Sequence, residues 1–296
     1  MAMEPPTLPR SPIRLADVLE LAKARIVGLV LVTVAAGFYV ANPGEVNWLL
    51  LVHSLVGTAL VAAGTNALNQ ILERDVDARM RRTANRPLPA GRLEVRTATV
   101  GAWSAGALGV AYLTVLVSPV VAVLAALTLL SYVFLYTPLK KRTSLATLVG
   151  AVPGALPIVG GWAAAGGRLG TEALVLFGVL FLWQIPHFLA LAWLYREDYA
   201  RAGLRMLSVG DVDGTRTFRQ ASLYALVLVP LSLAPVGLGL AGWIYFWGAL
   251  GLSCWMLQVA LQAARRPSRH AAGRLFKATV LYLPALLALL VSNSIR

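Results

Sequence analysis

The chain is dominated by apolar runs about as long as a lipid bilayer is thick. About 20 apolar residues in an α-helix cross the hydrocarbon core of a membrane. Such runs lie between charged segments at about 26–42, 48–72, 96–115, 119–137, 146–164, 172–195, 221–238, 241–262 and 276–293. Barrel strands would be about half as long and would alternate in polarity. The sequence therefore predicts an all-α integral membrane protein with about nine transmembrane helices, or eight if the seventh and eighth runs are one.

Composition excludes a water-soluble domain. Hydrophobic residues make up 58% of the chain and charged residues 13%, whereas soluble domains contain roughly half and a quarter. The single cysteine, Cys254, lies in an apolar run and excludes an intramolecular disulfide. The N-terminus lacks the apolar core of a signal peptide. We expect a cytoplasmic segment at 1–22, a single transmembrane domain at 23–296, and a bacterial cytoplasmic (inner) membrane as the location.

Charge orients the predicted bundle. The net charge of +13 would indicate nucleic-acid binding in a soluble protein. Here, with a cytoplasmic N-terminus, 24 of the 26 Lys and Arg residues fall on one side, and only Arg168 and Arg296 do not. Positive residues favour the cytoplasmic side, so the expected partner is the lipid bilayer and not nucleic acid. Eleven of the 13 acidic residues lie on that side too, which predicts chemistry at the cytoplasmic mouth.

A first acidic cluster follows the second apolar run. Asn69, Glu73 and Asp77 are spaced four apart, so on a helix they form one line down a face. Amide and carboxylate oxygens suit Mg²⁺, which takes one or two carboxylates plus substrate phosphates. A solvated helix end neutralised by nearby arginines explains the same spacing, and spacing alone leaves both interpretations open.

A basic loop comes next. Arg81, Arg82, Arg86 and Arg92 can offer paired donors to phosphate, and the prolines and glycine between them impose a turn. A polybasic loop lying on anionic lipid is the alternative that charge alone favours. The position of this loop beside the acidic helix end favours a site for a metal and a diphosphate.

A second acidic cluster follows the sixth run. Asp198 lies about two turns beyond that run, as Asp77 does beyond the second. We therefore expect the two clusters to face each other and to share one ligand. Glu197 is adjacent, and the sequence does not decide which of the two acids would bind a metal.

Two further features lie at helix ends or inside runs. Tyr136 and Lys140 are four residues apart at a predicted cytoplasmic helix end, which is also typical of interfacial anchors. His187 lies in or just below an apolar run. An ionisable group there is a functional candidate by default, and a neutral histidine bonded to a neighbouring helix is the alternative.

Together these residues resemble the UbiA superfamily of membrane prenyltransferases, over roughly 15–295, and within it the branch that farnesylates heme. The motifs that carry the resemblance are Asn69-xxx-Glu73-xxx-Asp77, the segment RTANRPL at 82–88, Tyr136-xxx-Lys140, the segment WQIPHF at 183–188, and Asp198-Tyr199 with Ala202-Gly203 and Met206-Leu207. The sequence departs from the family pattern in having only Glu197 and Asp198 in the second motif, Lys23-Ala24-Arg25 in the first helix, and Ser208 after Met206-Leu207.

The resemblance implies a UbiA-like helical bundle that transfers the farnesyl group of farnesyl diphosphate to a vinyl group of heme B, with addition of water, giving heme O and diphosphate. It implies Mg²⁺ held by Asn69, Glu73, Asp77 and Asp198, the same residues being catalytic together with Lys140. It places Arg25, Arg81, Arg82, Arg86 and Lys140 on the diphosphate. It places His187, Trp183 and Tyr136 on the acceptor side, with Tyr136, Trp183 or Phe188 facing a carbocation. It also suggests association with a heme A synthase.

Three other functions compete with this one. A prenyltransferase of the same family could act on an aromatic acid or quinone precursor, and only the acceptor-side residues discriminate. A transporter or channel would place charged residues at mid-membrane, which the charge distribution opposes. A lipid-binding scaffold has no use for paired acidic helix ends.

Overall fold

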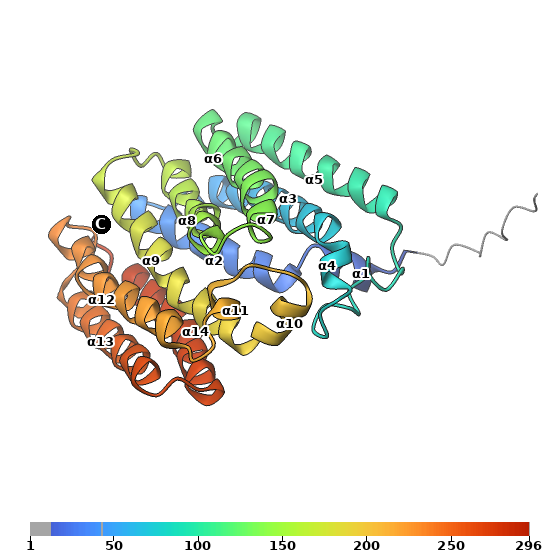
Figure 1. Ribbon diagram of the computed structural model, residues 1–296. Coiled ribbons are helices and arrows are strands. Elements are labelled where there is room, and N and C mark those ends of the chain that lie inside the picture. Colours follow the sequence, from blue (N-terminus) through green and yellow to red (C-terminus); the bar gives the residue numbers. More distant parts are fainter. Residues whose placement is uncertain (1–12, 43, 296) are drawn as a thin grey trace, which may run out of the picture.

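A computed structural model describes residues 13–42 and 44–295, and within those ranges it contains helices and no β-strand (Figure 1). Residues 1–12, with Arg10, and Arg296 lie outside the described residues. Nine helical stretches in the described ranges are long and apolar enough to cross a membrane. They are α2 (Ala24–Ala41), α3 (Trp48–Leu72), α5 (Val95–Leu116), the stretch Pro119–Leu139, α8 (Ala146–Ala164), α9 (Thr171–Leu194), α12 (Thr215–Gly237), α13 (Trp243–Arg265) and α14 (Arg269–Ser292). The prediction of an all-α, multi-pass membrane protein is confirmed.

The stretch Pro119–Leu139 is not one uniform helix. It consists of α6 (Pro119–Leu130), the π-helix η1 (Ser131–Tyr136) and α7 (Thr137–Leu139). Ser118 caps its start, because the Ser118 hydroxyl oxygen accepts a hydrogen bond from the backbone N–H of Val121 at 3.3 Å. π-helical turns are rare and often occur at functional sites. The sequence pattern predicted the span and not this change of helix type.

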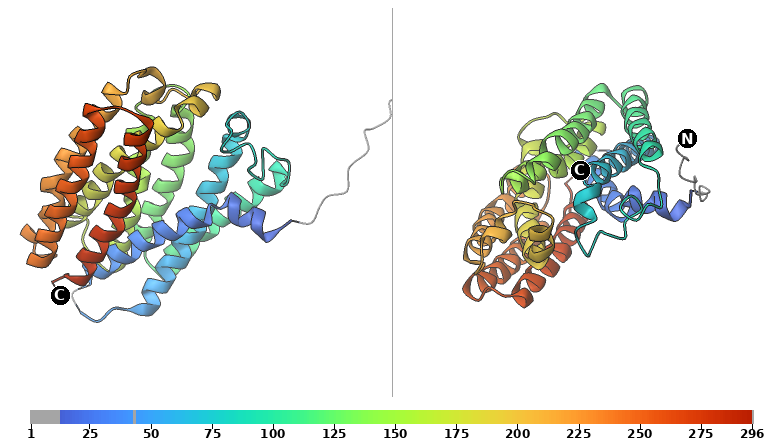
Figure 2. Two further views of the ribbon diagram at one scale, coloured as in Figure 1. Left: turned by 90° about the horizontal axis from the view of Figure 1, so that it is seen from below. Right: turned by 45° about the vertical axis from the view of Figure 1, so that its right-hand side comes forward.

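Four short helices lie outside the spans: α1 (Leu15–Leu21), α4 (Arg74–Asp77), α10 (Arg196–Arg201) and α11 (Leu207–Gly210). The left view of Figure 2 shows α10, α11 and the loop after α4 at one end of the bundle, and the end of α14 at the other. The segments that carry both acidic clusters therefore gather at the same end of the molecule.

Two predicted helix boundaries were wrong in a consistent direction. Helix α12 begins at Thr215 and α14 at Arg269, six or seven residues before the apolar runs at 221 and 276. The first two turns of α12 carry Arg216 and Arg219, those of α14 carry Arg269 and Arg274, and the apolar runs were taken to begin only after these charges. A helix can extend beyond the hydrocarbon into the polar interface, so its charged first turns belong to it even though they do not cross the membrane.

Helix α2 lies between two groups of helices (Figure 1). One apolar core joins it to α8, α9, α12, α13 and α14, and a second joins it to α3, α5 and α6. The contact with α8 is close because glycines face backbone carbonyls: Gly37 lies against Ile158, and Gly161 against Val34. Small residues allow such close approach between membrane helices. The position of α2 matters because its first residues border the site described next.

Candidate active site

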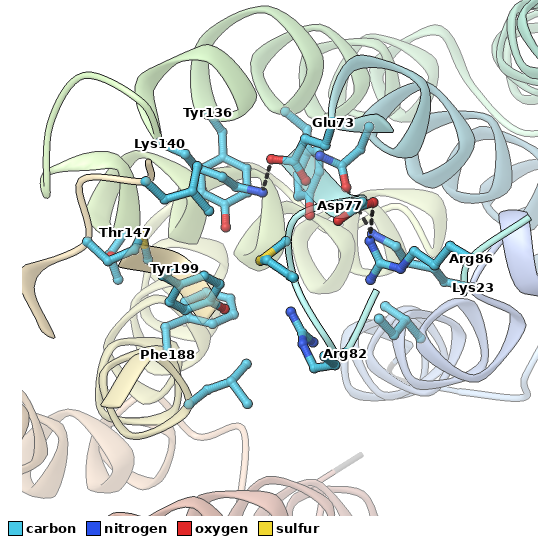
Figure 3. A pocket seen from close by; sticks show the side chains of 17 residues that line it. Lys23, Glu73, Asp77, Arg82, Arg86, Tyr136, Lys140, Thr147, Phe188 and Tyr199 are labelled. Carbon is cyan, nitrogen blue, oxygen red and sulfur yellow. Dashed lines mark hydrogen bonds and ion pairs between the residues drawn. The ribbon is translucent and has the colours of Figure 1, made fainter. Parts of the chain in front are cut away.

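A polar cavity of about 180 Å³ lies where the two acidic clusters meet (Figure 3). Its charged lining consists of Lys23, Glu73, Asp77, Arg82, Arg86 and Lys140. Its aromatic lining consists of Tyr132, Tyr136, Phe188 and Tyr199. The lining therefore contains four cations and two carboxylates, which is a charge balance that suits an anion.

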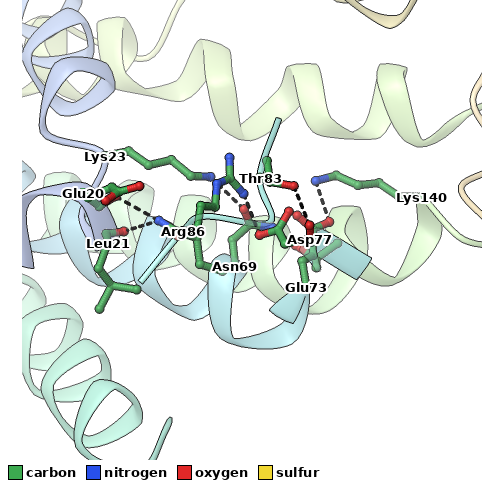
Figure 4. Close-up of polar contacts among 11 residues, drawn as sticks. Glu20, Leu21, Lys23, Asn69, Glu73, Asp77, Thr83, Arg86 and Lys140 are labelled. Carbon is green, nitrogen blue, oxygen red and sulfur yellow. Dashed lines mark hydrogen bonds and ion pairs between the residues drawn. The ribbon is translucent and has the colours of Figure 1, made fainter. Parts of the chain in front are cut away.

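Each carboxylate in the cavity is paired with a cation. The ammonium of Lys140 donates to Oε1 of Glu73 at 2.8 Å, and the guanidinium of Arg86 donates to Oδ2 of Asp77 at 2.6 Å (Figure 4). Burial alone would raise the pKa of Glu73, but the charge and hydrogen bond of Lys140, with Lys23 and Asn69, together outweigh it and hold that pKa below its usual range. Burial alone would lower the pKa of Lys140, but Glu73, together with Tyr136 and Tyr132, outweighs it and raises that pKa. Both directions keep this pair charged at neutral pH.

The other two cations of the cavity have no ion-pair partner among the residues that the structure describes. The Lys23 ammonium donates to the amide oxygen of Asn69 at 2.9 Å. The Arg82 guanidinium lies over the ring of Tyr195, 4.7 Å from its centroid. Burial and the positive charges of Arg86 and Lys140 lower the pKa of Lys23 to about 7. The surroundings of Lys23 thus disfavour a further positive charge, and a bound anion would relieve that cost.

Lys23 reaches the cavity because the chain breaks between α1 and α2. It has a left-handed backbone, with φ at 52°, and is the sole non-glycine residue with positive φ in the described ranges. Polar side chains of α3 hold the carbonyls before the break. Gln70 donates to the carbonyls of Glu20 at 3.1 Å and Leu21 at 2.7 Å, and Asn66 donates to that of Ala22 at 3.1 Å. A strained residue of this kind persists only where its surroundings impose it.

The basic loop folds back over the first cluster. The hydroxyl of Thr83 donates to the backbone carbonyl of Asp77 at 2.9 Å, which brings Arg82 and Arg86 to the cavity. Arg92 serves the scaffold instead, since its guanidinium donates to Asp17 at 2.6 Å and Glu20 at 2.8 Å and so ties the loop to α1. Arg82 and Arg86 of the loop therefore line the cavity, whereas Arg92 holds the loop against α1.

The second cluster contacts the first, as expected. A carboxylate oxygen of Asp198 accepts the backbone N–H of Arg81 at 3.4 Å. Val76 and Met80 pack with Ala202 and Leu204 in one small buried cluster. The Asp198 side chain is ion-paired with Arg201 and is not part of the cavity lining, whereas the neighbouring Tyr199 is. Glu197 is exposed. The two clusters meet, but through a loop and not through facing carboxylates.

The π-helix η1 brings two tyrosines to the cavity from the opposite wall. Tyr132 and Tyr136 make an edge-on ring contact at 4.9 Å, and the Lys140 ammonium lies 4.3 Å from the ring centroid of Tyr136. Thr137 links this wall to the first cluster, because its hydroxyl accepts from the amide of Asn69 at 3.2 Å and donates to the Tyr132 carbonyl at 2.8 Å. The sequence analysis missed Tyr132, although it lies four residues before Tyr136.

A second, apolar cavity of about 430 Å³ joins the first. Ile26, Tyr132, Tyr136 and Phe188 line both. The apolar cavity is bordered by α2, α3, α6, η1, α8, α9 and α14, and Trp183 and His187 lie in its wall. Leu29 and Val280, from α2 and α14, line it and are also exposed. The cavity therefore opens sideways between these two helices, toward the lipid.

The structure brings most of the predicted site residues to these two cavities. Those lining them are Asn69, Glu73, Asp77, Arg82, Arg86, Lys140, Tyr136, Trp183, His187 and Phe188. Arg25 and Arg81 are exposed and line neither cavity. Lys23, two residues before Arg25, occupies the place in the cavity that the sequence analysis gave to Arg25. The sequence signal that could have identified Lys23 is its position between a charged segment and the first apolar run.

One atom of the polar cavity fits a bound metal ion. Oδ1 of Asp77 is buried and has no hydrogen-bond partner in the described part of the chain, although Oδ2 is paired with Arg86. A buried carboxylate oxygen without a partner is costly, and a cation would satisfy it. Among the described residues, no three His, Cys, Asp or Glu side chains are close enough to enclose a metal. A metal here would need oxygens from Asn69 and from a ligand, as Mg²⁺ usually does.

Comparison with known sequences shows the family of this chain. The model of the UbiA prenyltransferase family matches residues 30–288. A protein of Solibacter usitatus named "Protoheme IX farnesyltransferase" is 44% identical, over 93% of this chain and 97% of its own length. A protein of the same name from Salinibacter ruber is 46% identical, also over 93% of this chain and 97% of its own.

Solved structures show the same fold at lower identity. A digeranylgeranylglyceryl phosphate synthase has a TM-score of 0.80 at 17% identity, covering 95% of this chain and 98% of that one. A UbiA homologue from Archaeoglobus fulgidus, bound to GPP and Mg²⁺, has a TM-score of 0.64 at 17% identity, covering 93% and 99%. At these identities the likeness concerns the fold.

Proposed function

This chain belongs to the UbiA prenyltransferase family, and from that premise we propose that it transfers the farnesyl group of farnesyl diphosphate to a vinyl group of heme B (protoheme IX), with addition of water, giving heme O and diphosphate. The relatives named for this reaction match it over nearly their whole length. The observation that carries the proposal is the junction of a cation-rich polar cavity with an apolar one. A diphosphate fits the first, and an isoprenoid tail fits the second.

The difficult step is heterolysis of the allylic C–O bond of farnesyl diphosphate, in which the electron pair leaves with the diphosphate. Negative charge therefore grows on the leaving group. Lys23 and Arg82, which have no carboxylate partner among the described residues, can donate to it directly, and Arg86 and Lys140 can donate while still paired. Preorganised donors of this kind are worth about 3–4 kcal/mol each in the transition state. Arg25 and Arg81 remain predictions for the same role.

Asn69, Glu73 and Asp77 are the residues that would hold Mg²⁺, with the unpartnered oxygen of Asp77 as the clearest ligand. Asp198 remains a prediction for the fourth ligand, because its carboxylate would have to leave Arg201. Mg²⁺ neutralises charge on diphosphate oxygens when it is bound. The ion pairs that Glu73 and Asp77 already make hold both carboxylates in place.

The farnesyl cation would form at the junction of the two cavities. Tyr132, Tyr136 and Phe188 border both cavities there, and aromatic faces stabilise cations. The vinyl π electrons of heme form the new C–C bond to the allylic carbon, which leaves a cation beside the porphyrin ring. Water adds to that cation and loses a proton, so that the sum is heme O, diphosphate and a proton. Apolar walls limit earlier capture of the farnesyl cation by water.

Trp183 and His187 mark the acceptor side, because both lie in the wall of the apolar cavity. The lateral opening between α2 and α14 suits two lipid-soluble substrates. We infer that the protein lies in a bacterial cytoplasmic membrane with its N-terminus and the polar cavity on the cytoplasmic side, since the positively charged loops gather there. Association with a heme A synthase remains a prediction.

The experiment is mass spectrometry of membranes that contain the protein and are supplied with heme B, farnesyl diphosphate and Mg²⁺. The expected product, heme O, has the mass of heme B plus one farnesyl group plus one hydroxyl group, because the added water loses a proton. A matched reaction with an aromatic acid or quinone precursor tests the alternative acceptor. Prenylation of that precursor without any heme O would overturn the choice of heme and leave the family assignment intact.

A further inference from the structure

His187 makes a hydrogen bond whose direction the neighbouring atoms determine. Its Nδ1 lies 2.9 Å from the hydroxyl oxygen of Thr279 on α14. That hydroxyl donates its only proton to the backbone carbonyl of Phe276 at 2.7 Å. A carbonyl oxygen can only accept, so the Thr279 hydroxyl has no proton left for the imidazole. Nδ1 must therefore be the donor, and the proton of a neutral His187 lies on Nδ1.

The other ring nitrogen then carries a lone pair. In a neutral imidazole only one nitrogen is protonated, so Nε2 of His187 is an electron-pair donor. Among the residues that the structure describes, Nε2 has no recorded hydrogen-bond partner, and His187 lies in the wall of the apolar cavity. Thr279 itself is fully buried behind the ring and lines neither cavity.

The ring is also held in orientation. Trp183 stacks on His187 with centroids 5.3 Å apart, and Phe276 lies at 4.9 Å on the ring. The indole N–H of Trp183 donates to the backbone carbonyl of Thr279 at 2.8 Å. Thr279 on α14 therefore positions Trp183 through its backbone carbonyl and His187 through its hydroxyl.

We propose that Thr279 is a positioning residue which fixes His187 in the Nδ1-protonated tautomer, so that Nε2 binds the iron of the heme substrate as an axial ligand. The inference rests on the proposed function for the identity of the ligand. Histidines that bind metals usually donate their second ring N–H to a nearby oxygen, which fixes the tautomer and makes the ligand nitrogen more basic. The bond formed is a dative one from the Nε2 lone pair to iron, and no proton or electron is transferred.

Axial ligation would also set the position of the porphyrin. His187 lines the apolar cavity, and Phe188, the residue next to it, lies at the boundary with the polar cavity. Iron ligation would thus hold a large, flat, hydrophobic substrate at a fixed depth in the apolar cavity, so that one vinyl group reaches the junction of the two cavities.

The first test is ¹⁵N NMR of the full-length protein with labelled histidine, in nanodiscs and without substrate. The chain has three histidines, so the spectrum of His187→Ala assigns the signals of His187. We expect a protonated Nδ1 and an unprotonated Nε2. The Thr279→Val variant should shift the signals toward the other tautomer, and Thr279→Ser, which keeps the hydroxyl, should restore them. A wild-type spectrum with the proton on Nε2 would overturn the proposal whether or not any variant folds.

The second test is a titration with heme B followed by the Soret band and by EPR of the ferric form. We expect an imidazole-ligated spectrum that His187→Ala loses, and a loss of heme affinity of roughly 10- to 100-fold in Thr279→Val. Thr99→Val is the matched control, because the Thr99 hydroxyl bonds to the carbonyl of Val95 in its own helix at 2.7 Å and lies outside both cavities. Equal heme spectra and affinities in the wild type and Thr279→Val would overturn the proposal.

The farnesyl transfer and the axial ligation of heme by His187 can be refuted separately. If the ¹⁵N signals and heme spectra behave as expected but no heme O forms, then the farnesyl transfer is wrong and the assignment of His187 and Thr279 is supported. If heme O forms but His187→Ala keeps the wild-type heme spectrum, the transfer is supported and the axial ligand is wrong.

Discussion

The ammonium nitrogen of Lys140 lies 2.8 Å from a carboxylate oxygen of Glu73, although 67 residues separate them in the sequence. The contact joins the end of the fourth membrane-spanning stretch to the end of α3. It keeps one carboxylate and one cation charged and adjacent at the wall of the polar cavity. The bond unites two motifs that the sequence presents separately, and the first prediction concerns the acidic half of it.

Replacing Glu73 by Gln or Asp77 by Asn should lower kcat by roughly 100- to 1,000-fold, because each change removes an electrostatic contribution to departure of the diphosphate. Thermal unfolding should show that both variants still fold. Asp75→Asn is the control: Asp75 lies on the same short helix, its side chain is 77% exposed, and it pairs with Arg74 on the surface. Wild-type turnover in Asp77→Asn would contradict the metal assignment.

Lys23→Gln should raise the KM for farnesyl diphosphate by roughly 10- to 150-fold, since a hydrogen bond to a charged group is worth about 1.5–3 kcal/mol. Arg25→Gln should change it little, because Arg25 is exposed and lines neither cavity. Steady-state kinetics at saturating heme measures both. The reverse order of effects would favour Arg25, the residue that the sequence suggested.

Excess chelator should stop heme O formation, and added Mg²⁺ should restore it. The reason is the buried oxygen of Asp77, which has no hydrogen-bond partner among the described residues and so indicates a place for a cation. Heme binding, measured by the Soret band, should persist in chelator, because Trp183 and His187 lie in the wall of the apolar cavity. Undiminished product in the presence of chelator would show that the cations of the cavity suffice.

Two adjacent glycines provide a stability test. A methyl group at Gly161 would meet the backbone carbonyl of Val34 on α2, whereas one at Gly160 would meet nothing. Gly161→Ala should destabilise the protein by about 1–3 kcal/mol through overpacking. Gly160→Ala should be neutral or stabilise it by up to about 1 kcal/mol, because alanine is the better helix former. Equal melting temperatures in the two variants would mean that α2 and α8 are farther apart than the structure has them.

The sequence was sufficient to predict the number and type of membrane spans, because a run of about 20 apolar residues has few stable structures other than a membrane-spanning helix. Helical spacing also predicted that Asn69, Glu73 and Asp77 lie together, and all three line the polar cavity, although α3 ends at Leu72 and Asp77 belongs to the separate short helix α4. The sequence did not predict the left-handed backbone at Lys23. That conformation depends on Asn66 and Gln70, which are more than 40 residues away.

Side-chain direction in the loops was likewise beyond the sequence. Arg81, Arg82 and Arg86 are equivalent by composition, yet Arg82 and Arg86 line the polar cavity and Arg81 does not. The bond from Thr83 to the carbonyl of Asp77 decides how the loop folds back. Asp198 shows the same limit, since its proximity to the first cluster was predicted but its pairing with Arg201 was not.

Four side chains border both cavities. The water-soluble and the lipid-soluble products of one reaction would therefore separate at the boundary between the two cavities. Diphosphate could depart toward water without crossing hydrocarbon. A farnesylated porphyrin could depart through the gap between α2 and α14 without ever being solvated. A product too insoluble to diffuse through the cytosol would then be released in the plane of the membrane. Any enzyme that modifies it further would have to bind it there.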